Sequence, residues 1–500
     1  MDYKPFFNFS KFNYSLIAGL FLITILFPLL FNDKIIRLFH DDSFFYMKTA
    51  YNNSIGIFSS FDNVNKTSGY HPLYMALLSG VSFFLPLSGQ QGIITVFALD
   101  MLMFLVFSLF IVKIMDKLKL NIFSKLITVL LLVCSLAFND FGIEVRLLLP
   151  LYWLLVLLLL NNYRNYLVLG VISALIFLTR IDSIIFIFFI TLFLLFENKQ
   201  FDIKKIKNIF FFILPIIIMF FLYILFSWIY FGHISSVSSW LKFGFNGVGY
   251  PIVHGFLGVR ARFLACILPA LVFLIYFSKN IFYKKYTPEL LLFFLMNLSN
   301  LAFLLVISNL SRGGLASWYF GLSISISIIT SVYLFKFFFG DKVNSVRLIK
   351  LLQVSFILIL TVALLIFLNR KLNYHYQDDA ISISRWINEN FDKNKNIFQV
   401  DNSGFTGYLS NRNIINGDGL INSWEYQDYL RNNDLVGYFK KYSINYIIWD
   451  KYHDEKQISI PVMFWNRPDE FLVLKDHKII KRSGRFVLLE FDYNETKLSK

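Results

Sequence analysis

Long runs of apolar residues constrain this chain more than any other feature of its sequence. A helix that crosses the hydrocarbon core of a bilayer needs about 20 predominantly apolar residues, and several runs reach that length. Charged residues make up 16% of the 500 residues, whereas soluble domains carry about 25%. The sequence therefore predicts a polytopic helical membrane protein. Twelve apolar runs occur, at residues 15–31, 72–88, 93–112, 125–138, 143–160, 165–179, 183–196, 209–231, 258–278, 289–308, 317–335 and 349–368.

The formal net charge of +15 indicates membrane topology rather than nucleic acid binding, and we expect no nucleic acid partner. Lys and Arg accumulate in the cytoplasmic loops of membrane proteins. Even numbers of apolar runs separate the neighbouring basic clusters, so one assignment places all of them in the cytoplasm. Four such clusters lie between apolar runs, at residues 113–125, 199–207, 279–285 and 336–350.

The N-terminus decides whether the run at 72–88 crosses the bilayer. Lys4 and Lys11 favour a cytoplasmic N-terminus, which agrees with the basic clusters only if 72–88 does not cross. This run is short and begins at Pro72, so we expect a juxtamembrane or re-entrant helix. The prediction is about eleven transmembrane helices in a multi-pass protein of the cytoplasmic (inner) membrane. The alternative is that 72–88 spans and one basic loop violates the rule.

Residues 370–500 have a different composition and read as a separate domain. Strand-like runs at 396–400, 445–449 and 485–491 alternate with helix-like runs at 380–390 and 425–442. We expect a small α/β domain outside the cytoplasm, periplasmic or extracellular. Residues 1–369 would form the transmembrane catalytic module, with a first outer loop at 32–92.

The first outer loop carries two adjacent carboxylates directly after the first apolar run. Long loops of this kind are usually functional when their composition does not suit disorder. Asp41 and Asp42 can divide the work, one as general base on an acceptor hydroxyl and the other orienting it. The pair can also hold Mg²⁺ or Mn²⁺. The competing interpretation is a helix N-terminus with acidic residues in its first turn.

Further ionisable residues fall on the same outer side in this topology. Ionisable residues at membrane depth are functional candidates, although Arg180 can pair with Asp182 and Arg260 can contact lipid headgroups. Cations in later outer loops suit the phosphate of a lipid-linked donor, since Arg offers a bidentate fork and Lys a point charge. The candidates for substrate or phosphate binding are His71, Glu144, Arg180, Asp182, Lys242, Arg260 and Arg312.

Five short motifs, in order along the chain, resemble those of bacterial GT-C-fold glycosyltransferases. Each motif alone is weak, but five in sequence are specific for that superfamily. They are Asp41-Asp42-Ser43-Phe44-Phe45-Tyr46 with Thr67-Ser68-Gly69-Tyr70-His71-Pro72, Phe141-Gly142-Ile143-Glu144, Leu178-Thr179-Arg180-Ile181-Asp182, Phe231-Gly232 followed by Ser238 and Lys242, and Ile415-Asn416-Gly417-Asp418-Gly419-Leu420.

The resemblance implies a membrane-embedded transferase of cell-envelope glycan biosynthesis. Such an enzyme moves a sugar, with inversion, from a polyprenyl-phosphate-linked donor to a hydroxyl of a glycan, lipid or protein acceptor. It implies a site at the outer boundary of the bilayer, a juxtamembrane helix after the first loop, and Asp41 as the base. Two other functions stay open, a lipid-linked glycan transporter or flippase and a glycan polymerase or ligase.

Overall fold

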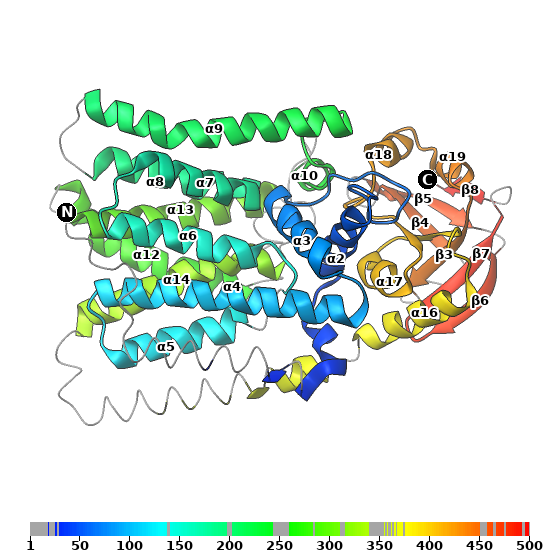
Figure 1. Ribbon diagram of the computed structural model, residues 1–500, viewed down its shortest axis with the longest axis horizontal. Coiled ribbons are helices and arrows are strands. Elements are labelled where there is room, and N and C mark those ends of the chain that lie inside the picture. Colours follow the sequence, from blue (N-terminus) through cyan, green and yellow to red (C-terminus); the bar gives the residue numbers. More distant parts are fainter. Residues whose placement is uncertain are drawn as a thin grey trace.

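The computed structural model shows a bundle of apolar helices with an α/β part at one end (Figure 1). It describes residues 19, 26–27, 30–137, 141–197, 203–243, 260–283, 286–310, 316–339, 355, 358, 362, 365–366, 368–373, 376–450, 458–463, 467–474, 477–492 and 496–499.

The helices of the bundle follow the apolar runs of the sequence. Among the described residues, five are long and apolar enough to cross a membrane, namely α4, α9, α12, α13 and the segment 317–338 that includes α14. Other apolar runs form shorter helices, and 15–31 and 349–368 lie largely outside the described residues, so the number of spans stays a prediction. The bundle helices are α4 (Gly89–Lys117), α5 (Ile122–Leu132), α6 (Val145–Leu160), α7 (Tyr166–Thr179), α8 (Ile184–Phe196), α9 (Ile203–Phe231), α12 (Arg260–Phe282), α13 (Pro288–Leu310) and α14 (Gly321–Phe339).

The run at 72–88 forms the short helix α3 (Pro72–Phe84), of 13 residues. At 1.5 Å per residue it reaches about 20 Å, less than the ~30 Å of a bilayer's hydrocarbon core. One face is buried through Tyr74 and Leu78, while Phe83 and Phe84 at its end are 66% and 87% exposed. This length and this exposed apolar end suit a helix that lies at the membrane boundary.

Two of the basic clusters between apolar runs have residues at the end of the bundle opposite the α/β part. Helix α4 begins near the α/β part, where the Tyr408 hydroxyl donates to the Gly89 carbonyl at 2.8 Å. It is 29 residues long and ends at Lys117, farther along the bundle. The ammonium of Lys336, near the end of α14, donates to the Leu118 carbonyl at 2.5 Å. Lys336, the described basic residue of the fourth cluster, therefore lies beside the first cluster at this end.

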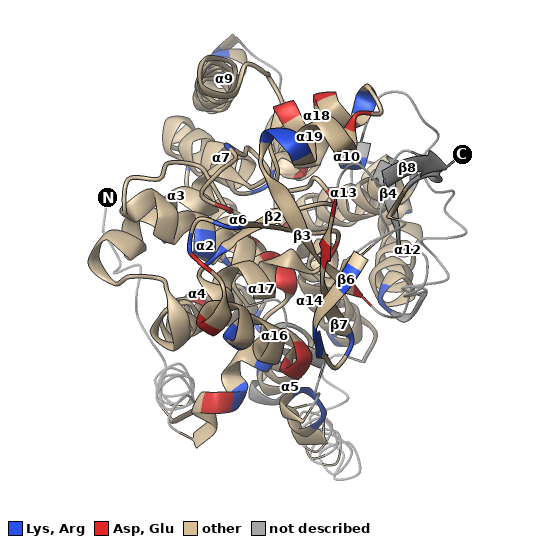
Figure 2. Ribbon diagram, turned by 90° about the vertical axis from the view of Figure 1, so that its right-hand side faces the viewer, with Lys and Arg blue, Asp and Glu red and all other residues tan. Residues whose placement is uncertain are grey.

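The α/β part contains a mixed sheet that lies across the ends of the bundle helices (Figure 2). Within the described residues its strand order is β2-β1-β3-β7-β6, with β1 parallel to β2 and β3, and β7 antiparallel to β3 and β6. A second sheet has the order β4-β5-β8. The strands are β1 (Asn396–Gln399), β2 (Asn413–Asn416), β3 (Ile444–Asp450), β4 (Ile458–Met463), β5 (Arg467–Leu474), β6 (His477–Ser483), β7 (Phe486–Phe491) and β8 (Thr496–Ser499).

Helices connect the parallel strands, as a crossover between parallel strands requires. These are α17 (Ser403–Ser410), between β1 and β2, and the pair α18 (Trp424–Arg431) and α19 (Leu435–Lys441), between β2 and β3. Helix α16 (Tyr376–Asn390) precedes β1. The helix-like run at 425–442 is therefore two helices rather than one. Asn433 adopts a φ of +55°, which Asn tolerates better than most residues, and the Asp434 side chain caps α19 by accepting from the Gly437 amide.

The first outer helix, α2 (Asp41–Ser54), packs directly on α17. The Phe44 ring lies 4.6 Å from that of Phe405, centroid to centroid, and 5.1 Å from that of Tyr408. Glycine at position 407 also permits α17 to pack closely on the first outer loop, since a Cβ there would come within 2.5 Å of the Phe61 ring. Phe44, Phe405 and Tyr408 belong to the same apolar core as the bundle, so the first outer loop lies between the bundle and the α/β part.

Candidate active site

The two adjacent aspartates of α2 have different surroundings. Both carboxylate oxygens of Asp41 accept backbone hydrogen bonds from the N-terminus of α17, from the Gly404 amide at 3.0 Å and the Phe405 amide at 2.8 Å. A carboxylate at a helix N-terminus also interacts favourably with the helix dipole. Burial raises the pKa of Asp41 well above its ordinary value, although the two amide bonds act in the opposite direction. Asp41 thus joins the first outer helix to the α/β part.

Asp42 instead lines an enclosed cavity of about 60 Å³ at the end of the bundle. Burial raises the pKa of the Asp42 carboxyl, and the Lys242 ammonium lowers it. The walls come from the first outer loop, α10 (Val237–Phe243), the segment around Tyr319 and the α/β part. The cavity is lined by Asp42, Phe45, Tyr46, Gly69, Tyr70, His71, Ile143, Glu144, Arg180, Ser238, Lys242, Trp318, Tyr319, Leu420 and Ile421.

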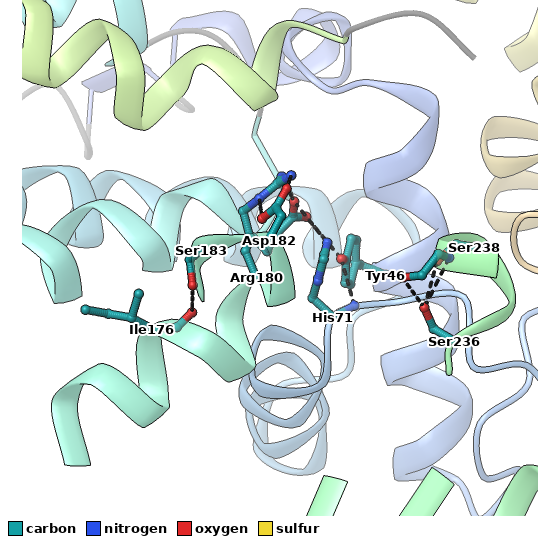
Figure 3. A network of polar contacts seen from close by, with 10 residues as sticks. Tyr46, His71, Ile176, Arg180, Asp182, Ser183, Ser236 and Ser238 are labelled. Carbon is teal, nitrogen blue, oxygen red and sulfur yellow. Dashed lines mark hydrogen bonds and ion pairs between the residues drawn. The ribbon is translucent and has the colours of Figure 1, made fainter. Parts of the chain in front are cut away.

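A buried ion-pair network forms one wall of this cavity (Figure 3). Arg180 follows α7 and donates to the Glu144 carboxylate at 2.5 Å. Its other nitrogens donate to both oxygens of Asp182, at 3.0 and 2.6 Å. Arg180 and Glu144 are each only 3% exposed. A buried guanidinium is stable when carboxylates of this kind satisfy its fork of donors.

Two residues of the first outer loop extend the network. The Tyr46 hydroxyl donates to Glu144 at 3.0 Å and accepts from the His71 backbone amide at 3.1 Å. The His71 imidazole lies 3.7 Å from the Glu144 carboxylate. Burial lowers the pKa of His71, even though Glu144 acts to raise it. At neutral pH His71 is therefore an uncharged hydrogen-bonding group at the cavity wall.

The turn that presents Glu144 is fixed by Asp100 of α4. One Asp100 oxygen accepts from the Gly142 amide at 2.6 Å, and the other accepts from the Tyr74 hydroxyl at 3.2 Å. Gly142 has a φ of +73°, a conformation that favours glycine, and a Cβ there would come within 2.7 Å of Ser43. The buried acid inside α4 therefore serves to hold this turn.

Lys242 reaches the cavity from α10, which the α/β part holds in place. Trp424, the first residue of α18, stacks on the His233 ring at 3.8 Å and contacts the Trp240 ring at 5.6 Å, centroid to centroid. The Val237 amide donates to the Ser68 hydroxyl at 3.1 Å. Contacts to α18 and to the first outer loop thus fix the helix that carries this cation.

The structure brings most of the sequence-predicted site residues together. Asp42, His71, Glu144, Arg180 and Lys242 line the cavity, and Asp182 adjoins it through its ion pair with Arg180. Asp41 borders a second, open groove beside Asp42. Arg260 begins α12 but its side chain lies outside the described residues, and Arg312 lies outside them altogether.

Three aromatic groups that line the site, Tyr46, Trp318 and Tyr319, were not among the predicted site residues. The Tyr319 ring lies 4.6 Å from the Arg180 guanidinium and 5.9 Å from the Lys242 ammonium, so its negative face stabilises both cations. Tyr46 lies four residues after Asp42, a spacing that places both on one helix face. That spacing is a signal in the sequence that identifies Tyr46.

The expected Mg²⁺ or Mn²⁺ site at Asp41 and Asp42 does not fit the local contacts. Both oxygens of Asp41 are engaged by the α17 amides, and the cation facing Asp42 is Lys242. Within the described part of the chain, no group of three or more His, Cys, Asp or Glu side chains is arranged to hold a metal ion. We therefore derive no step through a metal.

The first prediction concerns the buried network. Replacing Glu144 by Gln should lower the free energy of unfolding by about 1–3 kcal/mol, because buried Arg180 then keeps only one charged partner. The measurement is SDS-induced unfolding of the purified protein. The control is Asp428→Asn in an exposed ion pair with Arg431, where no measurable change is expected. Equal effects of the two substitutions would contradict a stabilising role for the network.

Comparisons with known proteins support the fold. No protein-family model matches the sequence, and no curated protein sequence matches it. Among solved structures, ArnT from Cupriavidus metallidurans, determined bound to undecaprenyl phosphate, is similar with a TM-score of 0.56. The similarity covers 96% of this chain and 97% of that one, at 11% sequence identity. At this identity the likeness establishes a shared fold, so the chain has an ArnT-like, multi-pass membrane architecture.

Proposed function

We propose that this protein is an inverting glycosyltransferase of the GT-C type. It would move a sugar from a polyprenyl-phosphate-linked donor to a hydroxyl of a glycan, lipid or protein. The observation that carries the proposal is a half-buried carboxylate, Asp42, sharing a cavity with Lys242 where the apolar bundle meets the polar α/β part. The polyprenyl phosphate bound by ArnT, a protein of the same fold, supports the donor class.

In the proposed reaction Asp42 is the general base. It accepts the proton of the acceptor hydroxyl while that oxygen attacks the anomeric carbon of the donor sugar. The bond from the anomeric carbon to the phosphate oxygen breaks, and polyprenyl phosphate leaves with the bonding electrons. Lys242 lies in the same cavity and stabilises the charge that develops on the phosphate. One displacement of this kind inverts the anomeric centre.

Asp42 suits this role better than Asp41, which the sequence resemblance favoured. Asp41 gives both oxygens to the α17 amides, so proton transfer would compete with the contact that docks the α/β part. Asp42 borders both the enclosed cavity and the adjoining open groove, so it can meet a donor on one side and an acceptor on the other. We therefore assign Asp41 as a positioning residue.

The enclosed cavity must widen before a sugar phosphate binds. Its volume of about 60 Å³ is well below the ~300–1,000 Å³ of typical ligand pockets. Two of its walls pack against each other. They are α10, which carries Lys242, and residues 420–421 of the α/β part, with Leu241 of α10 and Leu420 in one apolar cluster. Separation of these two walls would admit the donor.

A transport function has less support from the contacts. A transporter is expected to place ionisable residues near the middle of the bilayer, where they bind the substrate. Asp100, the acid inside α4, instead holds the turn at Gly142 with both carboxylate oxygens. The charged groups described at the site gather at one end of the bundle, as surface chemistry at the membrane boundary requires.

The central experiment compares the two aspartates. We expect Asp42→Asn to lower kcat for transfer from a polyprenyl-phosphate sugar by about 10²–10⁴-fold, the usual contribution of a general base. Binding of undecaprenyl phosphate should persist in this variant. Asp41→Asn should cost stability, because an amide cannot accept both α17 hydrogen bonds, while retaining more activity per folded molecule. Full turnover by Asp42→Asn together with an inactive, folded Asp41→Asn would move the base to Asp41.

Another prediction concerns the pH dependence of kcat/KM. A base with a raised pKa must be ionised to act, so kcat/KM should fall on acidification at a pH above the ordinary value of 3.8 for Asp. Lys242 lowers the pKa of Asp42, so Lys242→Gln should move this acid limb to higher pH. Lys242→Arg keeps the charge and should leave the limb in place. An identical limb in the wild type and in Lys242→Gln would contradict the pairing of these residues.

A last prediction concerns the orientation of the protein in the membrane. We propose that the N-terminus is cytoplasmic and that the α/β part lies outside. Single cysteines would be introduced at Lys204 and at Lys393, both exposed, in a background with Cys134 and Cys266 replaced by Ser. A membrane-impermeant maleimide should label position 393 in intact cells, or in spheroplasts where an outer membrane is present. It should label position 204 only after permeabilisation. The reverse pattern would place Asp42 on the cytoplasmic side and exclude the proposal.

A further inference from the structure

An open groove of about 620 Å³ lies on the other side of Asp42 from the enclosed cavity. Asp42 and Trp318 border both spaces, so these two side chains form part of the wall between them. The groove lies where the first outer loop, α17 and the segment before α16 meet. It is lined by Arg37, Phe39, His40, Asp41, Asp42, Trp318, Arg370, Lys371, Gln377, Asn402 and Phe405.

Cations line the groove on the side contributed by the segment before α16. Arg370 and Lys371 are neighbours there, and Arg37 approaches from the short helix η1 (Asn32–Leu38). Arg37 is held in place, because its guanidinium donates to the Leu372 carbonyl at 2.6 Å and to the Asp378 carboxylate at 2.8 Å. Three positive side chains therefore share the groove with the two aspartates of α2.

Two polar atoms of the groove residues are buried without a hydrogen-bond partner among the described residues. These are Nε of Arg37, a donor, and Oε1 of Gln377, an acceptor. The Gln377 residue is only 7% exposed. A buried polar atom left unpaired is costly. Two residues that line the groove therefore keep hydrogen-bonding capacity that no described residue uses.

We infer that this groove binds the acceptor, and that the acceptor is a sugar-containing molecule with a phosphate or carboxylate near the reacting hydroxyl. The inference rests on the proposed function. The hydroxyl would approach Asp42 from the groove, opposite to the donor, while Arg370 and Lys371 pair with the anionic group. The basic side chains offset the repulsion that Asp41 and Asp42 would otherwise exert on an anionic acceptor.

The test measures binding of two matched probes, octyl β-glucuronide and octyl β-glucoside, to the protein in nanodiscs of zwitterionic lipid. The probes differ only in a carboxylate in place of a hydroxymethyl group. We expect the glucuronide to bind about tenfold more tightly, as one charge-assisted contact predicts. Arg370→Gln/Lys371→Gln should remove this preference. The control Lys393→Gln/Lys395→Gln makes the same charge change at exposed positions and should retain it.

Several results would overturn the inference. Equal affinity for both probes, a preference that survives in Arg370→Gln/Lys371→Gln, or no binding of the glucuronide at millimolar concentration would each do so. The same cations could instead bind anionic lipid headgroups. In that case Arg370→Gln/Lys371→Gln would lose only its association with phosphatidylglycerol, measured in discs that contain this lipid. Its binding of the glucuronide would not change.

The acceptor assignment of the groove and the proposed glycosyltransferase function can be contradicted independently. Binding of undecaprenyl phosphate should depend on Lys242 and not on Arg370 or Lys371, and the glucuronide should not displace it. If Lys242→Gln weakens undecaprenyl phosphate binding while the two glycosides bind equally, only the acceptor assignment is wrong. If undecaprenyl phosphate does not bind at all, the proposed function fails, whatever the groove binds.

Discussion

The two hydrogen bonds that Asp41 accepts from the N-terminus of α17 hold the first outer helix against the α/β part. The rest of the site is built across this contact, because α2 carries Asp42 and Tyr46 while the α/β part contributes the wall at Leu420. The backbone amides and the helix dipole offset part of the hydration that the Asp41 carboxyl loses at this contact. The α/β part is therefore a component of the site.

Charge at the membrane boundary imposes a second constraint, since each buried ionic group needs a partner. Arg180 is held by Glu144 and Asp182 through three hydrogen bonds of 2.5–3.0 Å, so it stabilises the site before any substrate binds. Lys242 and Asp42 face the cavity from different elements. Arg180 and its carboxylate partners therefore form the scaffold of the site, whereas we assign Lys242 and Asp42 to the reaction.

Much of the fold could be predicted from the sequence, because the physical signals are local. Apolar runs indicate helices wherever the bilayer demands buried backbone hydrogen bonds, and α4, α9 and α13 follow those runs closely. Strands β1, β3 and β7 also fall where short apolar runs predicted them. The break between α18 and α19 was missed, because it depends on one Asn with positive φ and one Asp cap rather than on hydrophobicity.

By itself, the sequence determined a polytopic helical protein with adjacent acids in the loop after its first apolar run and cations in later loops. Only the tertiary structure decided which acid faces which group, because Asp41 and Asp42 are adjacent in the chain yet point to different partners. The same holds for the groove, where Arg37 meets Asp378 across 341 residues of sequence. Neither hydropathy nor local spacing encodes such a contact. It exists only after the bundle and the α/β part have packed against each other.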